Sequence, residues 1–414
     1  MNIQEIGRVV IIDDKYEEVK DLLKVLSKNK VSVMYFTGAE DELPEEPFSD
    51  IRIIFLDIEL GTGGQDDKTK ISTAVGVINR IIGTYNTSYL IILWTKHEEL
   101  INGIKDAIKS NPPIIMLDLE KNECKNDEGN FDINKIENKL KEKLRETGIF
   151  QLFIIWENLV HKSTGIIVNV FSSFYPRNND WNNKMSVIFR KLAEAYSGKQ
   201  LRDGDEIVKD ALLTFNDTFL DTLENEIKYY KNIGELAIND SNFNDDIAAQ
   251  INSRLHLIIE PQVNSVPGNI YEDWKDQVNI DDLFNGGGGI ESYSEKDSFL
   301  RNLKFILLEV SPYCDYAQNN WKFHRVLHGL MWPKNDFKKI KKKTDYIYTS
   351  PIFKVGSEIY KFVFNLRFLT TLSFEELNDK RPVLRIRHDL LVDIQSKISG
   401  HINRPGIIYL EKES

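Results

Sequence analysis

Four short apolar runs in the first third of the chain are its strongest structural constraint. One extends from Ile51 to Leu60 and presents the carboxylate of Asp57 near its end, and the other three are RVVIIDDK, YLIILWTK and IIMLDLEK. Runs of this length, each followed by a polar or helical stretch, are typical of parallel strands that are buried on both faces and joined by crossover helices. The sequence therefore predicts an α/β domain at the N-terminus.

Reactive side chains stand at the ends of these predicted strands. Asp13 and Asp14 close the first run, Asp57 ends the 51–60 run, Thr95 closes the next, and Lys121 closes the last. Ligand sites in open parallel sheets lie outside the carboxyl ends of the strands. We therefore expect three acids, a hydroxyl and an amine to converge on one pocket.

This set of residues resembles the receiver domain of two-component signalling, the module that accepts a phosphoryl group from a histidine kinase. The paired acids, the single acid, the threonine and the lysine occur here in the family's order. The resemblance implies a flavodoxin-like fold with a five-stranded parallel sheet, Asp57 as the phosphorylated residue, and Mg²⁺ held by Asp13, Asp14 and Asp57. Glu59 lies where the family lends a main-chain carbonyl to the metal.

The chemistry of these residues agrees with that role. A carboxylate that attacks a phosphoryl group must overcome the repulsion between two anions, and a hard cation bound by several oxygens reduces this repulsion. Lys121 is expected to balance the charge of the phosphoryl oxygens. The hydroxyl of Thr95 is expected to hydrogen-bond the phosphoryl group and to report its arrival.

Two stretches depart from the common receiver pattern. The segment GTGGQDDKTKIS after Leu60 is longer and richer in glycine than usual, and Lys121 is followed by Asn122 in place of the customary proline. These departures match a divergent receiver group associated with bacterial conflict and phage-defence operons, which implies an adaptor or a phosphate sink in antiviral defence. The alternative is a receiver-like docking module that no longer takes phosphate.

Composition and charge exclude several other function classes. The chain has 414 residues, 41% of them hydrophobic, which is enough for two or three domains with their own cores. A formal net charge of −11 argues against general binding to nucleic acid or to anionic membranes. A long apolar span and a signal peptide are not recognisable, and Cys124 and Cys314 are the only cysteines. A reducing, cytoplasmic location is therefore expected.

The sequence predicts three parts: the receiver-like α/β domain over 1–131, a helical bundle or linker over 132–260, and a β-rich, barrel-like domain over 261–414. The middle part shows apolar residues at helical spacing, and residues 150–161 are apolar nearly all round, as in a buried helix. One apolar helix face is a candidate dimer surface. Because no basic recognition helix follows the receiver-like part, we expect output through protein–protein contacts.

The C-terminal part resembles, over a short stretch, a barrel-like domain of bacterial conflict proteins. The matching residues are Ser311, Cys314 and Asp315, together with the turn formed by 404–406. Cys314 beside Asp315 is a candidate nucleophile for an effector enzyme that the receiver would switch, although a buried structural cysteine is the plainer interpretation.

A pair of histidines lies close to Cys314 in the sequence. His324 and His328 are four residues apart, which is a zinc-binding spacing if both lie on one face of a helix. Cys314 would then have to supply a third ligand. The sequence thus leaves three interpretations open: a phospho-acceptor signalling protein, a receiver-gated enzyme and a receiver-like docking module.

Overall fold

The computed structural model describes residues 9–61, 65–83, 88–97, 100–108, 111–145, 147–197, 203–231, 243–261, 266–272, 303–317, 322–335, 346–378 and 380–402. The chain divides into two compact units, one formed by Met1–Asn169 and Phe219–Leu236 and the other by Val170–Thr218 and Ala237–Ser414. Among the helices in these described ranges, none combines the length and hydrophobicity needed to span a bilayer.

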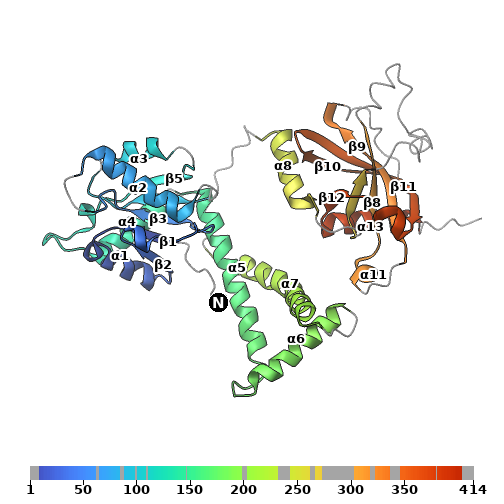
Figure 1. The fold of residues 1–414 in the computed structure, drawn as a ribbon, viewed down its shortest axis with the longest axis horizontal. Helices are drawn as coiled ribbons and strands as arrows, with labels where there is room; N and C mark the ends of the chain where they lie inside the picture. The colour runs from blue at the N-terminus through green and yellow to red at the C-terminus, as the bar shows by residue number, and fades with distance from the viewer. Residues whose placement is uncertain are drawn as a thin grey trace, which may run out of the picture. The chain divides into compact units, whose positions relative to one another are not determined.

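The first unit contains a five-stranded parallel sheet, drawn in blue to cyan in Figure 1. Its strands are β1 (Val9–Ile12), β2 (Val33–Phe36), β3 (Ile53–Leu56), β4 (Leu90–Leu93) and β5 (Ile115–Asp118). Their hydrogen-bonded order is β2-β1-β3-β4-β5, and every pairing is parallel. This is the order of doubly wound, flavodoxin-like sheets. The predicted α/β fold is confirmed.

Helices cover both faces of this sheet. They are α1 (Tyr16–Lys28), α2 (Asp67–Ile82), α3 (Ile101–Ala107) and α4 (Ile133–Arg145). Because successive strand residues point to opposite faces, Val10 and Ile12 of β1 pack in one cluster with α2 and α3, whereas Val9 and Ile11 pack in another with α1 and α4. Helix α4 therefore completes the α/β unit.

Three longer helices follow in the chain. They are α5 (Ile149–Ser172), α6 (Trp181–Ser197) and α7 (Gly204–Tyr229). At the start of α5, Phe150 joins the core of the α/β unit, and Glu157 accepts hydrogen bonds of 3.0 and 2.9 Å from the Arg52 guanidinium. Phe153 and Trp156 are nevertheless 57% and 53% exposed. The expectation of a helix buried all round is wrong, because only one face of α5 packs on the sheet unit.

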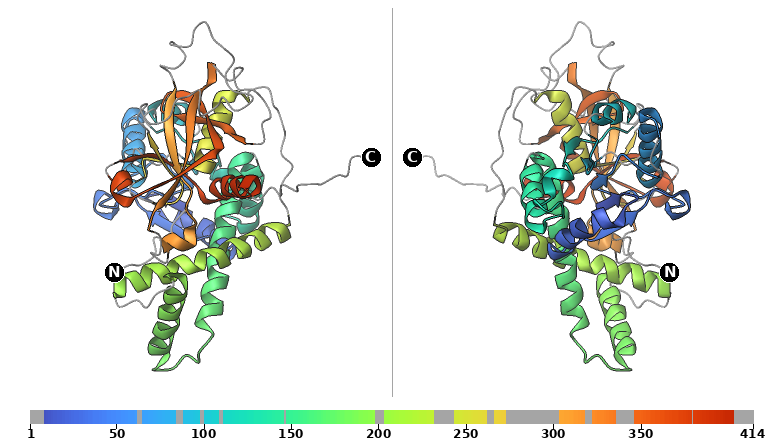
Figure 2. Two further views of the ribbon diagram at one scale, coloured as in Figure 1. Left: turned by 90° about the vertical axis from the view of Figure 1, so that its right-hand side faces the viewer. Right: turned by 90° about the vertical axis from the view of Figure 1, so that its left-hand side faces the viewer.

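The second unit contains a seven-stranded antiparallel sheet, whose orange and red strands are seen in Figure 2. The strands, in hydrogen-bonded order, are β10 (Ile347–Val355), β11 (Glu358–Leu372), β9 (His324–Pro333), β8 (Lys304–Glu309), β7 (Asn269–Glu272), β12 (Pro382–Ile386) and β6 (Leu257–Ile259). The predicted β-rich C-terminal part is confirmed, and antiparallel pairing joins all the neighbours.

Helices pack against this second sheet. They are α8 (Asp245–His256), α11 (Tyr313–Ala317), α12 (Phe374–Asn378) and α13 (His388–Ile402). The side chain of Ser253 in α8 donates a hydrogen bond of 2.9 Å to the carbonyl of Lys354 in β10. Leu257 of β6, Phe353 of β10 and Ile394 of α13 belong to one core cluster. The two end strands of the sheet, β6 and β10, therefore contribute to the same core as α13.

Candidate functional site

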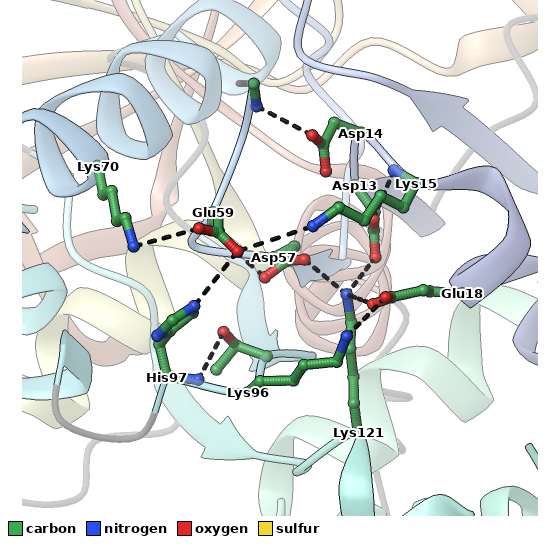
Figure 3. Close-up of polar contacts among 12 residues, drawn as sticks. Asp13, Asp14, Lys15, Glu18, Asp57, Glu59, Lys70, Lys96, His97 and Lys121 are labelled. Carbon is green, nitrogen blue, oxygen red and sulfur yellow. Dashed lines mark hydrogen bonds and ion pairs between the residues drawn. The ribbon is translucent and has the colours of Figure 1, made fainter. Parts of the chain in front are cut away.

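The carboxyl ends of four parallel strands bring the predicted residues together (Figure 3). Asp13 and Asp14 follow β1, and Asp57 follows β3, with its amide donating a hydrogen bond of 2.8 Å to β1. Thr95 follows β4 and Lys121 follows β5, and the amide of Lys121 donates to the carbonyl of Thr95 at 3.1 Å. The convergence expected from the parallel topology is therefore present in the structure.

Three carboxylates of this site can hold a cation. One oxygen from each of Asp13, Asp14 and Asp57 lies within 4.8 Å of the other two. Oδ2 of Asp14 accepts a hydrogen bond of 3.1 Å from the amide of Gly61, whereas its Oδ1 is buried without a hydrogen-bond partner among the described residues. Carboxylate oxygens are the ligands that hard divalent cations prefer. The donor set therefore fits a divalent cation and is compatible with Mg²⁺.

Lys121 is the buried cation of the site. Its side chain is 0% exposed, and Nζ donates hydrogen bonds to Asp57 Oδ2 at 2.5 Å, Asp13 Oδ2 at 2.7 Å and Glu18 Oε2 at 2.8 Å. Burial by itself would lower the pKa of Lys121, but the charges of Asp57 and Asp13 outweigh it and raise this pKa above its usual value. The amine is therefore held as an ammonium.

The acid–base behaviour of Asp13 differs from that of an exposed aspartate. Burial raises the pKa of Asp13 to about 6, and the neighbouring charge of Asp57 acts in the same direction, while Lys121 opposes the shift. A carboxyl group with this pKa takes up a proton just below neutral pH. Since a metal ligand must be deprotonated, a proton would compete with a divalent cation for Asp13.

Cation binding is accordingly expected to weaken as the pH falls through 6. The raised pKa of Asp13 means that Mg²⁺ must displace a proton below this value, so the dissociation constant for Mg²⁺ should be about tenfold higher at pH 5 than at pH 7.5. Calorimetric titration with Mg²⁺ at several pH values measures this effect. A dissociation constant that stays the same across the range contradicts the prediction.

Glu59 lies outside the set of three carboxylates. Its side chain pairs at the rim of the site with Lys70 at 3.3 Å, His97 at 3.4 Å and Lys15 at 3.7 Å (Figure 3). Burial opposes a low pKa, but hydrogen bonds with Lys70 and His97 lower the pKa of Glu59 overall. Its amide donates to Asp57 Oδ1 at 3.3 Å. That the main-chain carbonyl of Glu59 contributes to cation binding stays a prediction.

Sequence patterns did not single out two further residues of the site, Glu18 and Lys96. Glu18 lies in the first turn of α1 and accepts hydrogen bonds from Lys121 at 2.8 Å and from Lys96 at 2.6 Å. Partial burial opposes the shift, yet these hydrogen bonds lower the pKa of Glu18 to about 2. Their positions in the sequence could have identified these two residues, because Lys96 directly follows Thr95 and Glu18 lies in the first turn of the helix after β1.

Thr95 is itself buried, and its hydroxyl accepts a hydrogen bond of 3.1 Å from the amide of His97.

The second predicted site, in the C-terminal part, is not assembled by the described residues. Cys314 lies in α11, but its side chain and the turn 404–406 fall outside the part of the chain that the structure describes. The hydroxyl of Ser311 donates a hydrogen bond of 2.5 Å to the fully buried carboxylate of Glu309. The side chain of Asp315 is 39% exposed. A nucleophilic role for Cys314 therefore stays a prediction.

The histidine pair lies on a strand rather than on the expected helix. His324 and His328 both belong to β9, and residues four apart in a strand are separated by about 13 Å. That spacing is too long for one zinc ion, so the zinc site that a helix would have allowed is not formed by these two residues. His328 Nε2 instead lies 2.9 Å from Thr370 Oγ1, and His324 Nδ1 lies 3.6 Å from Glu309 Oε1.

Comparisons with known proteins give no assignment. No family model matches the chain, and no curated protein matches it. A de novo designed Rossmann 2x3 fold protein is similar at 16% identity over 34% of this chain and 91% of its own, with a TM-score of 0.20. An adenylate cyclase structure from Rhodopirellula baltica is similar at 17% identity over 38% of this chain and 98% of its own, with a TM-score of 0.21. TM-scores of this size assign neither a fold nor a function to this chain.

Proposed function

We propose that the N-terminal α/β unit is a receiver-like phospho-acceptor domain, in which Asp57 takes a phosphoryl group from a histidine kinase. One observation carries the proposal: Asp57 shares a buried corner with two more carboxylates and with an ammonium, that of Lys121, 2.5 Å away. Phosphoryl transfer depends mainly on positioning and on neutralising charge. A cation-binding acid cluster beside a buried amine meets both requirements.

The transfer step combines a phosphohistidine of the kinase with Asp57, Lys121 and Thr95 of this chain. An oxygen of Asp57 attacks the phosphorus of a phosphohistidine, the O–P bond forms as the N–P bond breaks, and the imidazole nitrogen keeps the electron pair and takes up a proton. Lys121 then offers its charge to the phosphoryl oxygens, and the Thr95 hydroxyl donates a hydrogen bond to them. Mg²⁺ bound by Asp13, Asp14 and Asp57 would supply further positive charge.

A protein–protein output fits the packing around this site. Phosphorylation turns the singly charged carboxylate of Asp57 into an acyl phosphate that carries about two negative charges, a net gain of about one. The phosphoryl oxygens compete for the donors of Lys121 and so disturb the end of β5. Ile136 of α4 and Phe150 of α5 share a core cluster with Leu117 of β5. A displacement of the end of β5 would therefore be transmitted to helices α4 and α5. A role as adaptor or phosphate sink in antiphage defence is proposed from the receiver resemblance alone.

The proposal is tested with small phosphoryl donors. Incubation with acetyl phosphate and Mg²⁺ should add one phosphoryl group per chain, seen by intact mass, and hydroxylamine should remove it, as expected of an acyl phosphate. Beryllofluoride should bind in the presence of Mg²⁺ and be detected by calorimetry. Failure of both reactions would favour the docking-module alternative instead.

The enzyme alternative is separated by a second variant. Cys314→Ala should leave phosphorylation of the α/β unit unchanged, because Cys314 lies in the second unit and Asp57 in the first. Loss of the protein's cellular function in Cys314→Ala, with phosphorylation intact, would move the assignment to a receiver-gated enzyme.

A further inference from the structure

One carboxylate outside the acid cluster connects two cations of the site. Glu18 accepts a hydrogen bond from Lys121 on Oε2 at 2.8 Å and one from Lys96 on Oε1 at 2.6 Å (Figure 3). The two lysines follow different strands, since Lys96 comes directly after Thr95 at the end of β4 and Lys121 comes after β5. Glu18 itself lies in the first turn of α1. A single side chain therefore joins three elements at the edge of the sheet.

All three donors of the Lys121 ammonium are engaged. An ammonium has three N–H groups, and those of Lys121 reach Asp13, Asp57 and Glu18. A cation bound between Asp13 and Asp57 repels this ammonium, and a phosphoryl group on Asp57 needs one of its donors. Glu18 is the one of the three acceptors that does not belong to the set of cation-binding carboxylates. It can therefore hold Lys121 in every state of the site.

We propose that Glu18 is a positioning residue that sets the balance between cation binding and phosphoryl binding. The inference rests on the proposed function. The carboxylate of Glu18 offsets part of the charge of Lys121, so that the ammonium repels a divalent cation less and attracts a phosphoryl anion less. Lys96 offsets the charge on the other oxygen of Glu18 and so reduces the share of the Lys121 charge that Glu18 can offset.

Replacing Glu18 by glutamine removes the charge and keeps the size of the side chain. The dissociation constant for Mg²⁺ should rise about three- to tenfold, as expected for the loss of one charge near a divalent cation in a solvated site. The dissociation constant for beryllofluoride, measured at saturating Mg²⁺, should fall about threefold. A merely structural role would weaken both ligands, so the opposite signs identify charge balance.

The same helix turn offers a matched control. Glu17 is exposed and pairs with Lys20, so Glu17→Gln makes the same change of charge away from the site. It should change each dissociation constant by less than about twofold. Glu18→Asp, which keeps the charge, should return the Mg²⁺ dissociation constant toward the wild-type value.

A double-mutant cycle tests the link to Lys96. Lys96→Met leaves the charge of Glu18 less compensated, so Mg²⁺ should bind more tightly and beryllofluoride more weakly than in the wild type. In the Glu18→Gln background these changes should be absent, which gives a coupling of at least about twofold. Additive effects of the two substitutions contradict the proposed link.

The outcomes for the two proposals are distinguishable. Wild-type protein that binds neither Mg²⁺ nor beryllofluoride overturns the proposed function and this inference together. Wild-type protein that binds both, with Glu18→Gln behaving like Glu17→Gln, overturns the role of Glu18 and leaves the proposed function intact. Weaker binding of both ligands in Glu18→Gln also overturns the proposed role of Glu18.

Discussion

The Asp57→Asn variant is expected to lose phosphorylation by acetyl phosphate by at least roughly 100-fold, as is usual when the attacking group of a site is removed. An amide is a poor nucleophile for phosphorus, and the substitution also removes one of the three charges that face a bound cation. The variant should still fold, because Lys121 keeps Asp13 and Glu18 as acceptors. Intact mass after incubation with acetyl phosphate and Mg²⁺ measures the loss.

A nearby acid provides the control for this substitution. Asp67 is an exposed residue at the start of α2, and Asp67→Asn should be phosphorylated as fast as the wild type. Undiminished phosphorylation of Asp57→Asn would mean that the phosphoryl group is carried by another residue. The assignment of Asp57 as the acceptor would then be wrong.

Replacing Lys121 by methionine is expected to destabilise the α/β unit by about 3 kcal/mol when divalent cations are absent. The substitution leaves the buried carboxylates of Asp13 and Asp57 without the ammonium that lies 2.7 and 2.5 Å from them. Mg²⁺ should restore more stability to the variant than it adds to the wild type, since it no longer competes with the ammonium. Urea unfolding with and without Mg²⁺, followed by fluorescence, measures both effects.

A half-buried lysine of the same unit, which pairs with an exposed acid, serves as the comparison. Lys143 lies 3.7 Å from Asp118, whose side chain is 61% exposed, and surface pairs of this kind contribute about 1 kcal/mol or less. Lys143→Met should therefore unfold close to the wild-type midpoint and respond to Mg²⁺ as the wild type does. If Lys121→Met is equally stable and gains nothing from Mg²⁺, Lys121 is not the counter-ion of the acid cluster.

Much of the first unit could be predicted from local patterns. The strands β1 and β4 are buried at every position, and a strand covered on both faces must be apolar throughout, which makes it recognisable as a short continuous run. The rule that parallel strands present their carboxyl ends at one edge then brought Asp13, Asp57 and Lys121 together. No pairwise contact had to be known in advance.

Local patterns failed where a neighbouring element decided the outcome. The apolar run that begins α5 predicts burial all round, yet Phe153 and Trp156 are exposed because only one face of the helix meets the sheet unit. The spacing of His324 and His328 suits a helix, but hydrogen bonding to β8 and β11 makes this segment a strand. Pairing between distant segments overrode the local signal in the second case.

The sequence by itself determined which reactive residue ends each parallel strand and that the three acids lie close together. Both follow from hydrophobic periodicity and from the handedness of a doubly wound sheet. Only the tertiary structure decided which acid shares Lys121 with that cluster. Glu18 and Lys121 are 103 residues apart, and their contact of 2.8 Å depends on how α1 packs against the ends of the strands. Short-range periodicity reports which face of an element is buried, whereas the partners of a charged side chain depend on packing between elements.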